Sequence, residues 1–305
     1  MAFNLQTFRT RTLTAVFFVL VMLAGLLLNQ WSFFILFTII HFGCWREYQK
    51  LIGLIHQSYN DITPFHRYGV MLAGWSIMLY FASDAIRIGS LTFSSVGWWL
   101  GLVFVFGLPI VEILFSRQLN LKNIGYSALG LLYISLSCGL MLNIRSGELW
   151  MPGENNESIF KGLSGVLASL TGYVVPLIII ASMWINDTMA YIVGSLIGKT
   201  PFWPSISPKK TWEGTVGGIV LCVVTVTLIG VYLIKGQALP FMAISLTASL
   251  AGTGGDLLES KIKRLAGVKD SGSVMPGHGG FLDRFDSLLV AVPFVWLLIV
   301  VFKIV

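Results

Sequence analysis

Long apolar stretches separated by short polar segments make up most of this chain. A helix needs about 20 predominantly apolar residues to cross a bilayer. The pattern predicts an all-α, polytopic bundle of about nine transmembrane helices, with a further, partly inserted segment at 187–198. The predicted spans are approximately 12–28, 31–45, 66–82, 94–115, 124–143, 166–186, 214–234, 238–253 and 287–305.

The composition supports a membrane protein and excludes a soluble domain. Of the 305 residues, 55% are hydrophobic and only 11% are charged, and the mean hydropathy is +0.81. Soluble domains carry about 25% charged residues and cannot bury this much apolar surface. Cys44, Cys138 and Cys222 all fall in apolar runs, so we expect neither a disulfide framework nor a CxxC metal site.

Lysine and arginine are distributed unevenly over the predicted loops. With a cytoplasmic N-terminus, most of them fall on the cytoplasmic side, as the positive-inside rule requires. This orientation also places two polar segments, 187–213 and 254–286, in the cytoplasm. We expect one integrated membrane domain, with N-terminal transmembrane helices in 1–165 and a C-terminal catalytic region with cytoplasmic loops in 166–305.

Three aspartates lie near the cytoplasmic ends of predicted spans. Asp256 follows a GTGG segment, where we expect one helix to break and another to begin, with Glu259 completing a capping box. Asp283 and Asp286 are one helical turn apart at the start of the last span. Helix capping or the helix dipole would explain each aspartate singly. Together they favour a site for Mg²⁺, which prefers hard oxygen ligands and completes its shell from phosphates.

Cationic side chains accompany these aspartates. Lys209 and Lys210, in SPKKTWEGT, precede a predicted span, so two cations and a helix N-terminus can meet one anion. A membrane anchor with an interfacial Trp212 would explain the same residues. Carboxylates for a metal and cations for phosphates indicate phosphoryl or nucleotidyl transfer, and the apolar body suggests a lipid as the other substrate. Further cations follow Asp256, namely Lys261, Lys263, Arg264 and Lys269.

Two polar positions allow more than one interpretation. Asp187 stands at the end of a predicted span, where it fits a helix cap or a pocket wall, and we favour the pocket. The following GSLIGKT is one residue short of a P-loop and follows no strand, so Gly194 and Gly198 fit a small-residue helix contact better. His278 lies between two glycine elements, and we expect it to donate a hydrogen bond to a phosphate. A lone histidine does not indicate zinc.

Residues 260–286 carry a pattern found in a known family. The run SKIKRLAGVKDSGSVMPGHGGFLDRFD closely resembles the signature of phosphatidate cytidylyltransferases, the CDP-diacylglycerol synthases. It departs from that signature at Met275, where Leu, Ile or Phe is expected. SPKKTWEGT and NDTMAYIVGSLIGK are also similar to family segments, so the resemblance covers roughly residues 180–290.

The resemblance implies a reaction and a set of site residues. CTP and phosphatidic acid would give CDP-diacylglycerol and pyrophosphate in phospholipid biosynthesis, with Mg²⁺ and, as an option, a second, monovalent cation. The implied metal ligands are Asp256, Asp283 and Asp286, which with Lys263 are the predicted catalytic residues. The predicted partners are CTP, phosphatidic acid and the bilayer, with no nucleic acid and with a homodimer as an option. The predicted substrate-binding residues are Asp187, Ser207, Lys209, Lys210, Arg264, Lys269, Asp270 and His278.

Two other functions stay open at this point. A CTP-dependent polyprenol or phytol kinase would use an alcohol as its acceptor. An ion-coupled transporter would also carry intramembrane carboxylates, but usually at the midplane between paired halves, and the two halves of this chain are unlike. The size of the chain and the lack of a long cytoplasmic extension favour a bacterial inner-membrane protein whose active site faces the cytoplasm.

Overall fold

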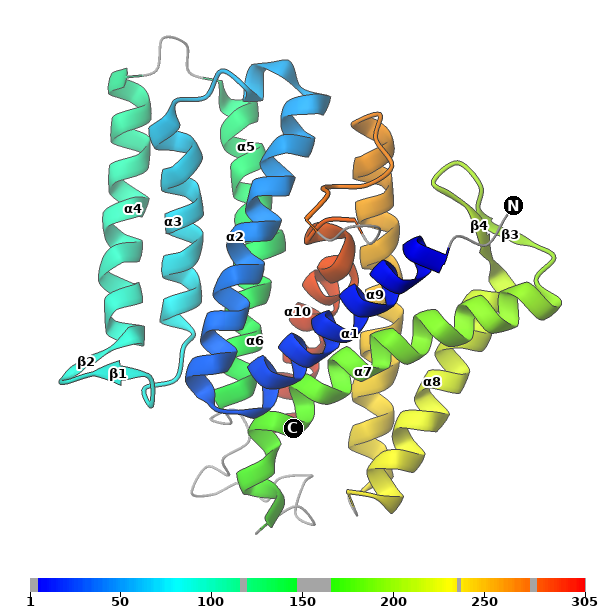
Figure 1. Cartoon of the computed structure of the whole chain (residues 1–305). Coiled ribbons are helices and arrows are strands. Elements are labelled where there is room, and N and C mark those ends of the chain that lie inside the picture. Colours follow the sequence, from blue (N-terminus) through cyan, green and yellow to red (C-terminus); the bar gives the residue numbers. More distant parts are fainter. Residues whose placement is uncertain (1–4, 116–119, 147–165, 235–236, 275–278, 305) are drawn as a thin grey trace. The chain divides into compact units, whose positions relative to one another are not determined.

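The computed structural model describes residues 5–115, 120–146, 166–234, 237–274 and 279–304 of the chain. α-Helices make up most of these residues, together with two short β-hairpins (Figure 1). By their internal contacts they form two compact units. Unit 1 contains the described residues of 1–142 and 262–285, and unit 2 contains those of 143–261 and 286–305. Most of the signature segment therefore belongs to the unit built by the N-terminal helices.

Unit 1 is helical, and its helices begin with recognisable caps. The side chain of Asn29 accepts a hydrogen bond from the backbone N–H of Ser32 (2.8 Å) ahead of α2, and Thr63 caps α3, which starts with Pro64. Figure 1 shows α3 and α4 side by side, with the β1–β2 hairpin at one end. The elements are α1 (Leu5–Leu27), α2 (Gln30–Ile55), η1 (Gln57–Tyr59), α3 (Pro64–Tyr80), β1 (Arg87–Ile88), β2 (Leu91–Thr92), α4 (Phe93–Phe115), α5 (Leu121–Gly130), η2 (Leu131–Leu136) and α6 (Ser137–Ser146).

The core of unit 1 lies along α2. Phe33, Phe37 and Trp45 are fully buried there. The π-helical stretch η2, between α5 and α6, brings Ser135 against this core. Its hydroxyl accepts a hydrogen bond from the Trp45 indole (2.8 Å) and lies 3.0 Å from Nε2 of His41. The Trp45 indole, the Ser135 hydroxyl and Nε2 of His41 are thus paired with one another, as burial favours, while Nδ1 of His41 has no hydrogen-bond partner among the described residues.

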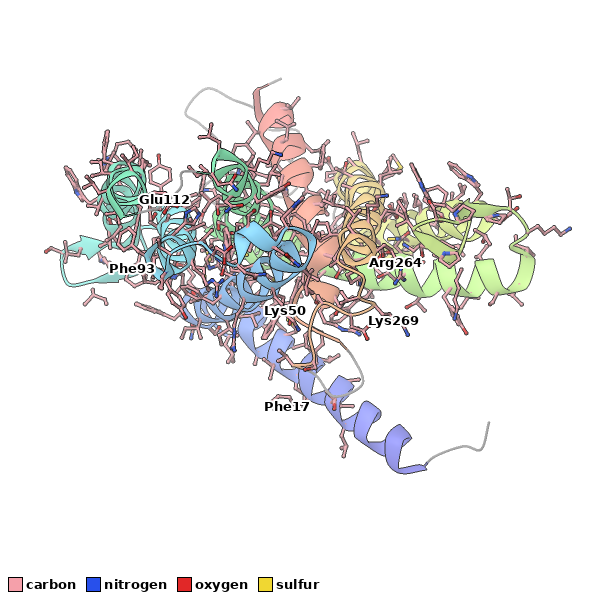
Figure 2. The ribbon with its side chains drawn as sticks, turned by 90° about the horizontal axis from the view of Figure 1, so that it is seen from above. Phe17, Lys50, Phe93, Glu112, Arg264 and Lys269 are labelled. Carbon is pink, nitrogen blue, oxygen red and sulfur yellow. The ribbon has the colours of Figure 1, made fainter. Side chains whose placement is uncertain are left out.

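α1 and α4 leave much of their apolar surface uncovered. Phe17 on α1, labelled in Figure 2, is 68% exposed, and Leu114 on α4 is 70% exposed. Helices that face the hydrocarbon core of a bilayer carry apolar side chains on their outer surface. The exposed apolar surface therefore agrees with helices that face lipid.

Unit 2 contains the longest helices and one hairpin. α7 and α8 pack closely against each other because glycines lie at their contact. A Cβ atom on Gly214 would stand 2.7 Å from the carbonyl oxygen of Ala190. A Cβ atom on Gly194 would stand 3.5 Å from the Cα of Gly214. The small-residue contact predicted for Gly194 is therefore present. The elements are α7 (Val166–Ile197), β3 (Pro201–Trp203), β4 (Ser207–Thr211), α8 (Trp212–Tyr232), α9 (Ala238–Leu265) and α10 (Leu282–Ile304). The last turn of α9 and the first turn of α10, residues 262–265 and 282–285, belong to unit 1.

The predicted all-α membrane fold is confirmed, and each predicted span falls on helix. Six helices of the described residues are long and apolar enough to cross a membrane, so the number nine stays a prediction. Two predicted details are wrong. Residues 187–197 are not a separate segment but the continuation of α7, and Gly252–Gly255 do not break α9, which runs on to Leu265. Asp256 is accordingly inside a helix and caps nothing.

The glycines of α9 instead allow a close approach of α10. A Cβ atom on Gly255 would stand 2.6 Å from the carbonyl oxygen of Asp286, whereas a Cβ on Gly254 would meet nothing within 4 Å. We expect Gly255→Ala to lower the free energy of unfolding by about 1–3 kcal/mol through overpacking. Gly254→Ala should raise it by about 0.5–1 kcal/mol, because alanine restricts the unfolded chain. Thermal unfolding of the two purified variants checks this, and equal shifts in both would contradict the close approach.

Candidate active site

A polar cavity of about 360 Å³ lies within unit 2. Its walls come from α7, from β4 and α8, which follow each other directly in the chain, and from α9. Asp187 and Asp256 contribute carboxylates, and Lys209 and Lys210 contribute ammonium groups. The interpretation of Asp187 as a pocket wall, rather than a helix cap, is thereby favoured, since α7 continues ten residues beyond it to Ile197. Charges of both signs gather around this one cavity.

Lys210 and Asp256 form an ion pair across the cavity wall. The side chains keep 29% and 27% of their surface exposed, so neither charge is fully desolvated. The other carboxylate oxygen of Asp256 lies 3.4 Å from the hydroxyl of Ser260, one helical turn further along α9. Asp256 therefore has a cationic partner on β4.

The cavity also contains a buried amide oxygen. Asn186 is 5% exposed, and its side-chain N–H₂ donates weakly to the hydroxyl of Thr253 (3.4 Å). Its oxygen has no hydrogen-bond partner among the described residues. A buried acceptor without a donor costs about 1–3 kcal/mol, so this oxygen indicates a site for a ligand that supplies a cation or a donor.

The β3–β4 hairpin places the two lysines. Its strands pair antiparallel between Pro201 and Thr211, and the carboxylate of Glu213 accepts hydrogen bonds from the backbone N–H groups of Lys199 and Thr200 (3.1 Å each). Thr211 caps α8 by accepting from the N–H of Gly214 (3.2 Å). These bonds fix the turn after α7 against the first turn of α8, and β4 carries the lysines between them.

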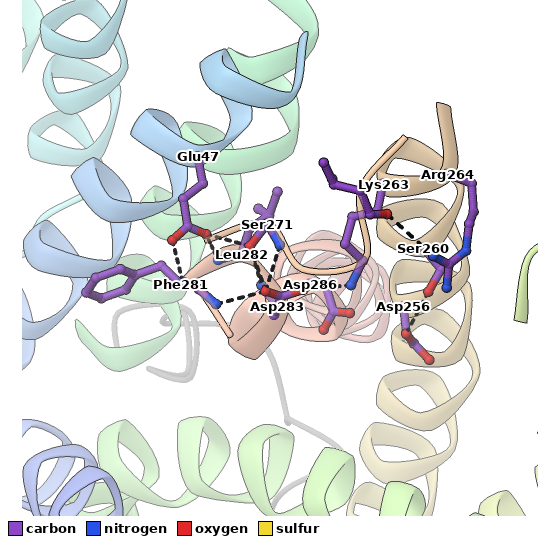
Figure 3. Close-up of polar contacts among 12 residues, drawn as sticks. Glu47, Asp256, Ser260, Lys263, Arg264, Ser271, Phe281, Leu282, Asp283 and Asp286 are labelled. Atoms are coloured by element: carbon purple, nitrogen blue, oxygen red, sulfur yellow. Dashed lines mark hydrogen bonds and ion pairs between the residues drawn. The ribbon is translucent and has the colours of Figure 1, made fainter. Parts of the chain in front are cut away.

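In unit 1 the signature segment is organised around Asp283 (Figure 3). One carboxylate oxygen accepts from the ammonium group of Lys263 (2.6 Å). The other accepts from the backbone N–H groups of Ser271 (2.9 Å) and Gly280 (2.8 Å). Asp283 therefore joins the end of α9, the segment after it and the first turn of α10, and Lys263 is held by this carboxylate.

A second carboxylate in this network was not predicted from the sequence. Glu47 on α2 is only 7% exposed, and Figure 3 shows it facing the start of α10. It accepts from the backbone N–H groups of Phe281 (2.9 Å) and Leu282 (2.8 Å) and from the hydroxyl of Ser271 (2.6 Å). Glu47 thus caps α10 from another helix. A lone glutamate inside WREYQKL carries no motif that could have revealed this role.

Glycines in the signature segment make room for these carboxylates. A Cβ atom on Gly272 or Gly280 would overlap the Glu47 carboxylate. Gly279 has φ +84°, a left-handed conformation that glycine adopts without strain. Gly279 is therefore required by the backbone turn, and Gly272 and Gly280 are required by the approach of Glu47.

The other predicted site residues have varied surroundings. Ser207 begins β4 and is partly buried. Arg264 donates to the carbonyl oxygen of Val268 (3.4 Å) at an exposed position, while Lys269 and Asp270 are exposed. His278 lies outside the described residues. The roles of these five residues in binding substrate stay predictions.

The predicted metal ligands are divided between the units. Asp256 and Asp286 belong to unit 2 and Asp283 to unit 1, although Asp283 and Asp286 are one turn apart on α10. Asp286 is 9% exposed, and its carboxylate accepts from the N–H of Ser287 (2.6 Å). Within the described part of either unit, no three carboxylate, imidazole or thiol groups gather at one point. The metal site therefore stays a prediction.

The fold and the cavity define a polytopic membrane protein with paired lysines and aspartates around a polar site. The chain belongs to the Cytidylyltransferase family, which matches residues 9–302. The family resemblance of residues 260–286 is confirmed.

Individual relatives carry more specific names. The chain is 46% identical over 124 residues to the phosphatidate cytidylyltransferase of Bacillus subtilis strain 168, a match that covers 40% of this chain and 45% of that protein. It is 36% identical over 260 residues to phosphatidate cytidylyltransferase 4, chloroplastic, of Arabidopsis thaliana, with coverages of 80% and 61%. For the chloroplastic enzyme numbered 5 of the same plant, the identity is 39% over 260 residues, with coverages of 80% and 60%. The matches thus span about half to three fifths of the length of these relatives.

Proposed function

We propose that this protein transfers the cytidylyl group of CTP to phosphatidic acid and releases pyrophosphate. The observation that carries the proposal is the cavity of unit 2, where Lys209 and Lys210 stand with Asp187 and Asp256 among apolar helices. Lysines bind phosphate oxygens as point charges. A charged cavity in a membrane protein suits one polar substrate and one lipid substrate. The names of the relatives support the same pair of substrates.

The reaction needs little proton transfer from the protein. An oxygen of the lipid phosphate attacks the α-phosphorus of CTP, and a P–O bond forms there. The bond between the α-phosphorus and the bridging oxygen breaks, and its electron pair leaves with pyrophosphate. Since a phosphate monoester is largely ionised at pH 7, the nucleophile needs no general base. The protein's task is to position and to neutralise phosphates, which Lys209 and Lys210 can do.

The oxygen atoms of the cavity fit Mg²⁺. The carboxylates of Asp187 and Asp256 and the unpartnered amide oxygen of Asn186 are hard ligands, and Mg²⁺ takes the remainder of its shell from waters and phosphates. When bound, Mg²⁺ would neutralise charge on the nucleotide phosphates. Asp283 and Asp286 stay predicted ligands. Lys263 acts through Asp283, to which it is bonded, so we assign it a positioning role.

We further propose that the cavity faces the cytoplasm of a bacterium and that the protein lies in the inner membrane. Lys209 and Lys210, which precede the N-terminus of α8, support this orientation by the positive-inside rule. CTP is a cytoplasmic nucleotide, so the orientation also places the cavity on the side where that substrate occurs.

Position-specific labels in CTP test the reaction directly. The purified protein is incubated with phosphatidic acid and with CTP labelled at the α-phosphorus or, separately, at the γ-phosphorus. We expect the α-label in the lipid product and the γ-label in pyrophosphate, and we expect chelation of Mg²⁺ to stop both. A CTP-dependent kinase acting on a polyprenol would transfer the γ-label to lipid instead. Transfer of the γ-label, or no transfer with any lipid acceptor, would refute the proposal.

A further inference from the structure

Unit 1 contains a second cavity, of about 370 Å³, between α3, α4 and α5. Its walls are mostly apolar, with Val70, Phe104, Leu108 and Leu131 among the lining residues. The volume falls in the range of roughly 300–1,000 Å³ that is typical of small-molecule sites. No lysine or arginine side chain of the described residues lines it. This cavity therefore differs in chemistry from the charged cavity of unit 2.

One end of the apolar cavity is polar. His66 on α3, Glu112 on α4 and Ser127 on α5 line it there, and Glu112 is labelled in Figure 2. Nε2 of His66 lies 2.8 Å from the hydroxyl of Ser127, and Nδ1 lies 3.2 Å from the carboxylate of Glu112. The hydroxyl of Tyr59 lies 3.0 Å from that of Ser127. Four polar side chains thus form a chain that ends at Glu112.

The contacts allow one continuous direction of proton donation along this chain. Burial raises the pKa of the Tyr59 phenol, against a smaller opposing effect of its hydrogen bond to Ser127, so the phenol keeps its proton and can donate to Ser127. Ser127 can then donate to Nε2 of His66, and Nδ1–H points towards Glu112. The chain ends at Glu112, whose nearest oxygen lies 3.2 Å from Nδ1 without a well-aligned hydrogen bond.

Glu112 retains unused acceptor capacity. The carboxylate atom nearest to His66 is buried and receives no well-aligned hydrogen bond from the described residues. A carboxylate has about four lone-pair sites, and in apolar surroundings an unmet acceptor is costly. A molecule in this cavity should therefore present a hydrogen-bond donor to Glu112.

The charge of the site selects the kind of donor. A phosphate or a fatty-acid carboxylate would meet Glu112 with a like charge and with no cation of the described residues lining the cavity. An ammonium group would lose its hydration in an apolar cavity, and it has three N–H donors, more than one unmet carboxylate oxygen needs. A neutral hydroxyl supplies a single donor at a smaller desolvation cost.

The length of the cavity fits one acyl chain. Its lining extends along α3 from His66 to Ile77, which at about 1.5 Å per residue is roughly 16 Å, or about half of a hydrocarbon layer about 30 Å thick. At the far end Ser76 donates its hydroxyl proton to the carbonyl oxygen of Ala73 (2.6 Å), so it offers no free donor. The polar end and the apolar length together match an amphiphile in one leaflet.

We propose that this cavity binds a neutral, hydroxyl-bearing membrane amphiphile, with its hydroxyl on Glu112 and its alkyl chain along α3 and α4. The order serine, histidine and glutamate also occurs in nucleophilic triads. Ser127, however, lies inside helix α5, whose backbone N–H groups bond within the helix, so the oxyanion-binding donors that such a triad needs do not accompany it. The site is therefore one of binding. It does not depend on the function proposed for unit 2.

Two glycines of α4 provide a matched test. A Cβ atom on Gly101, which lines the cavity, would meet only the Ser76 hydroxyl at 3.6 Å, and a Cβ on Gly107, which does not line it, would meet nothing within 4 Å. Gly101→Leu should therefore fill the cavity without a clash at the backbone. Gly107→Leu makes the same change on the same helix outside the cavity.

The full-length protein in lipid nanodiscs is labelled with a photoreactive dodecanol and, in parallel, with the corresponding acid and amine. We expect saturable labelling by the alcohol on peptides of α3, α4 and α5. Gly101→Leu and Glu112→Leu should each reduce it about tenfold or more, the second through the loss of its acceptor, while Gly107→Leu should leave it unchanged. Thermal unfolding verifies that both glycine variants are folded. Non-saturable labelling, equal labelling of the two glycine variants, or preference for the acid or the amine would overturn the proposal.

Discussion

Asp256→Asn is expected to reduce cytidylyl transfer by about 10²–10³-fold and to leave the thermal unfolding of the protein nearly unchanged. Asp256 supplies one of the two carboxylates of the unit 2 cavity and is paired with Lys210. Both side chains are more than a quarter exposed, and ion pairs at such positions contribute only about 0–1 kcal/mol to stability. The loss should therefore appear in turnover, and in a higher Mg²⁺ concentration for half-maximal rate.

A matched variant tests whether the loss of turnover depends on where the negative charge is removed. Asp61→Asn removes the same charge from an exposed residue between η1 and α3 and should keep wild-type turnover. Steady-state rates at several Mg²⁺ concentrations, with unfolding temperatures of both variants, make the comparison. Wild-type turnover by Asp256→Asn would show that this cavity is not the active site.

Glu47→Gln is expected to lower turnover by about a hundredfold and the free energy of unfolding by about 2–3 kcal/mol. Both carboxylate oxygens of Glu47 accept hydrogen bonds, one from Phe281 and the other from Leu282 and Ser271. A glutamine has one acceptor, so in either orientation its amide N–H₂ faces a backbone N–H group. The start of α10 and the segment before it should shift as a result.

The control for this prediction is Ser271→Ala. It removes one donor to Glu47 and leaves both backbone N–H groups bonded. We expect a smaller loss of stability, about 0.5–1.5 kcal/mol, and a correspondingly smaller loss of turnover. Activity and unfolding temperature of the two variants check the order. If Glu47→Gln were as stable and as active as the wild type, the capping of α10 by Glu47 would be refuted.

The sequence predicted helices well and their ends poorly. A span is readable because the hydrocarbon layer demands a long apolar run, and every predicted span falls on helix. That demand stops at the membrane surface, where polar residues can continue a helix. α7 and α9 therefore extend through residues 187–197 and 254–265, which the pattern of polarity had placed in cytoplasmic segments.

Site residues were predictable only where charged residues cluster in the sequence or stand at the end of a predicted span. Lys209, Lys210, Asp187 and Asp256 were predicted and do line one cavity. Glu47 and Glu112 stand alone among apolar neighbours, and their roles follow from partners far away in the chain. A single carboxylate has no spacing that indicates such a partner, so only the three-dimensional structure reveals it.

The hydrogen bonds of Glu47 also have a consequence for biosynthesis. Its partners Phe281 and Leu282 follow it by 234 and 235 residues. The ribosome must therefore add the 235 residues from Tyr48 to Leu282 before the signature segment can close on α2, and a contact of such long range forms slowly. Until then the Glu47 carboxylate lacks the backbone N–H groups of Phe281 and Leu282 as hydrogen-bond donors. We therefore expect membrane proteases to degrade a nascent chain truncated before α10 faster than the complete chain, even though most of its spans have already been inserted.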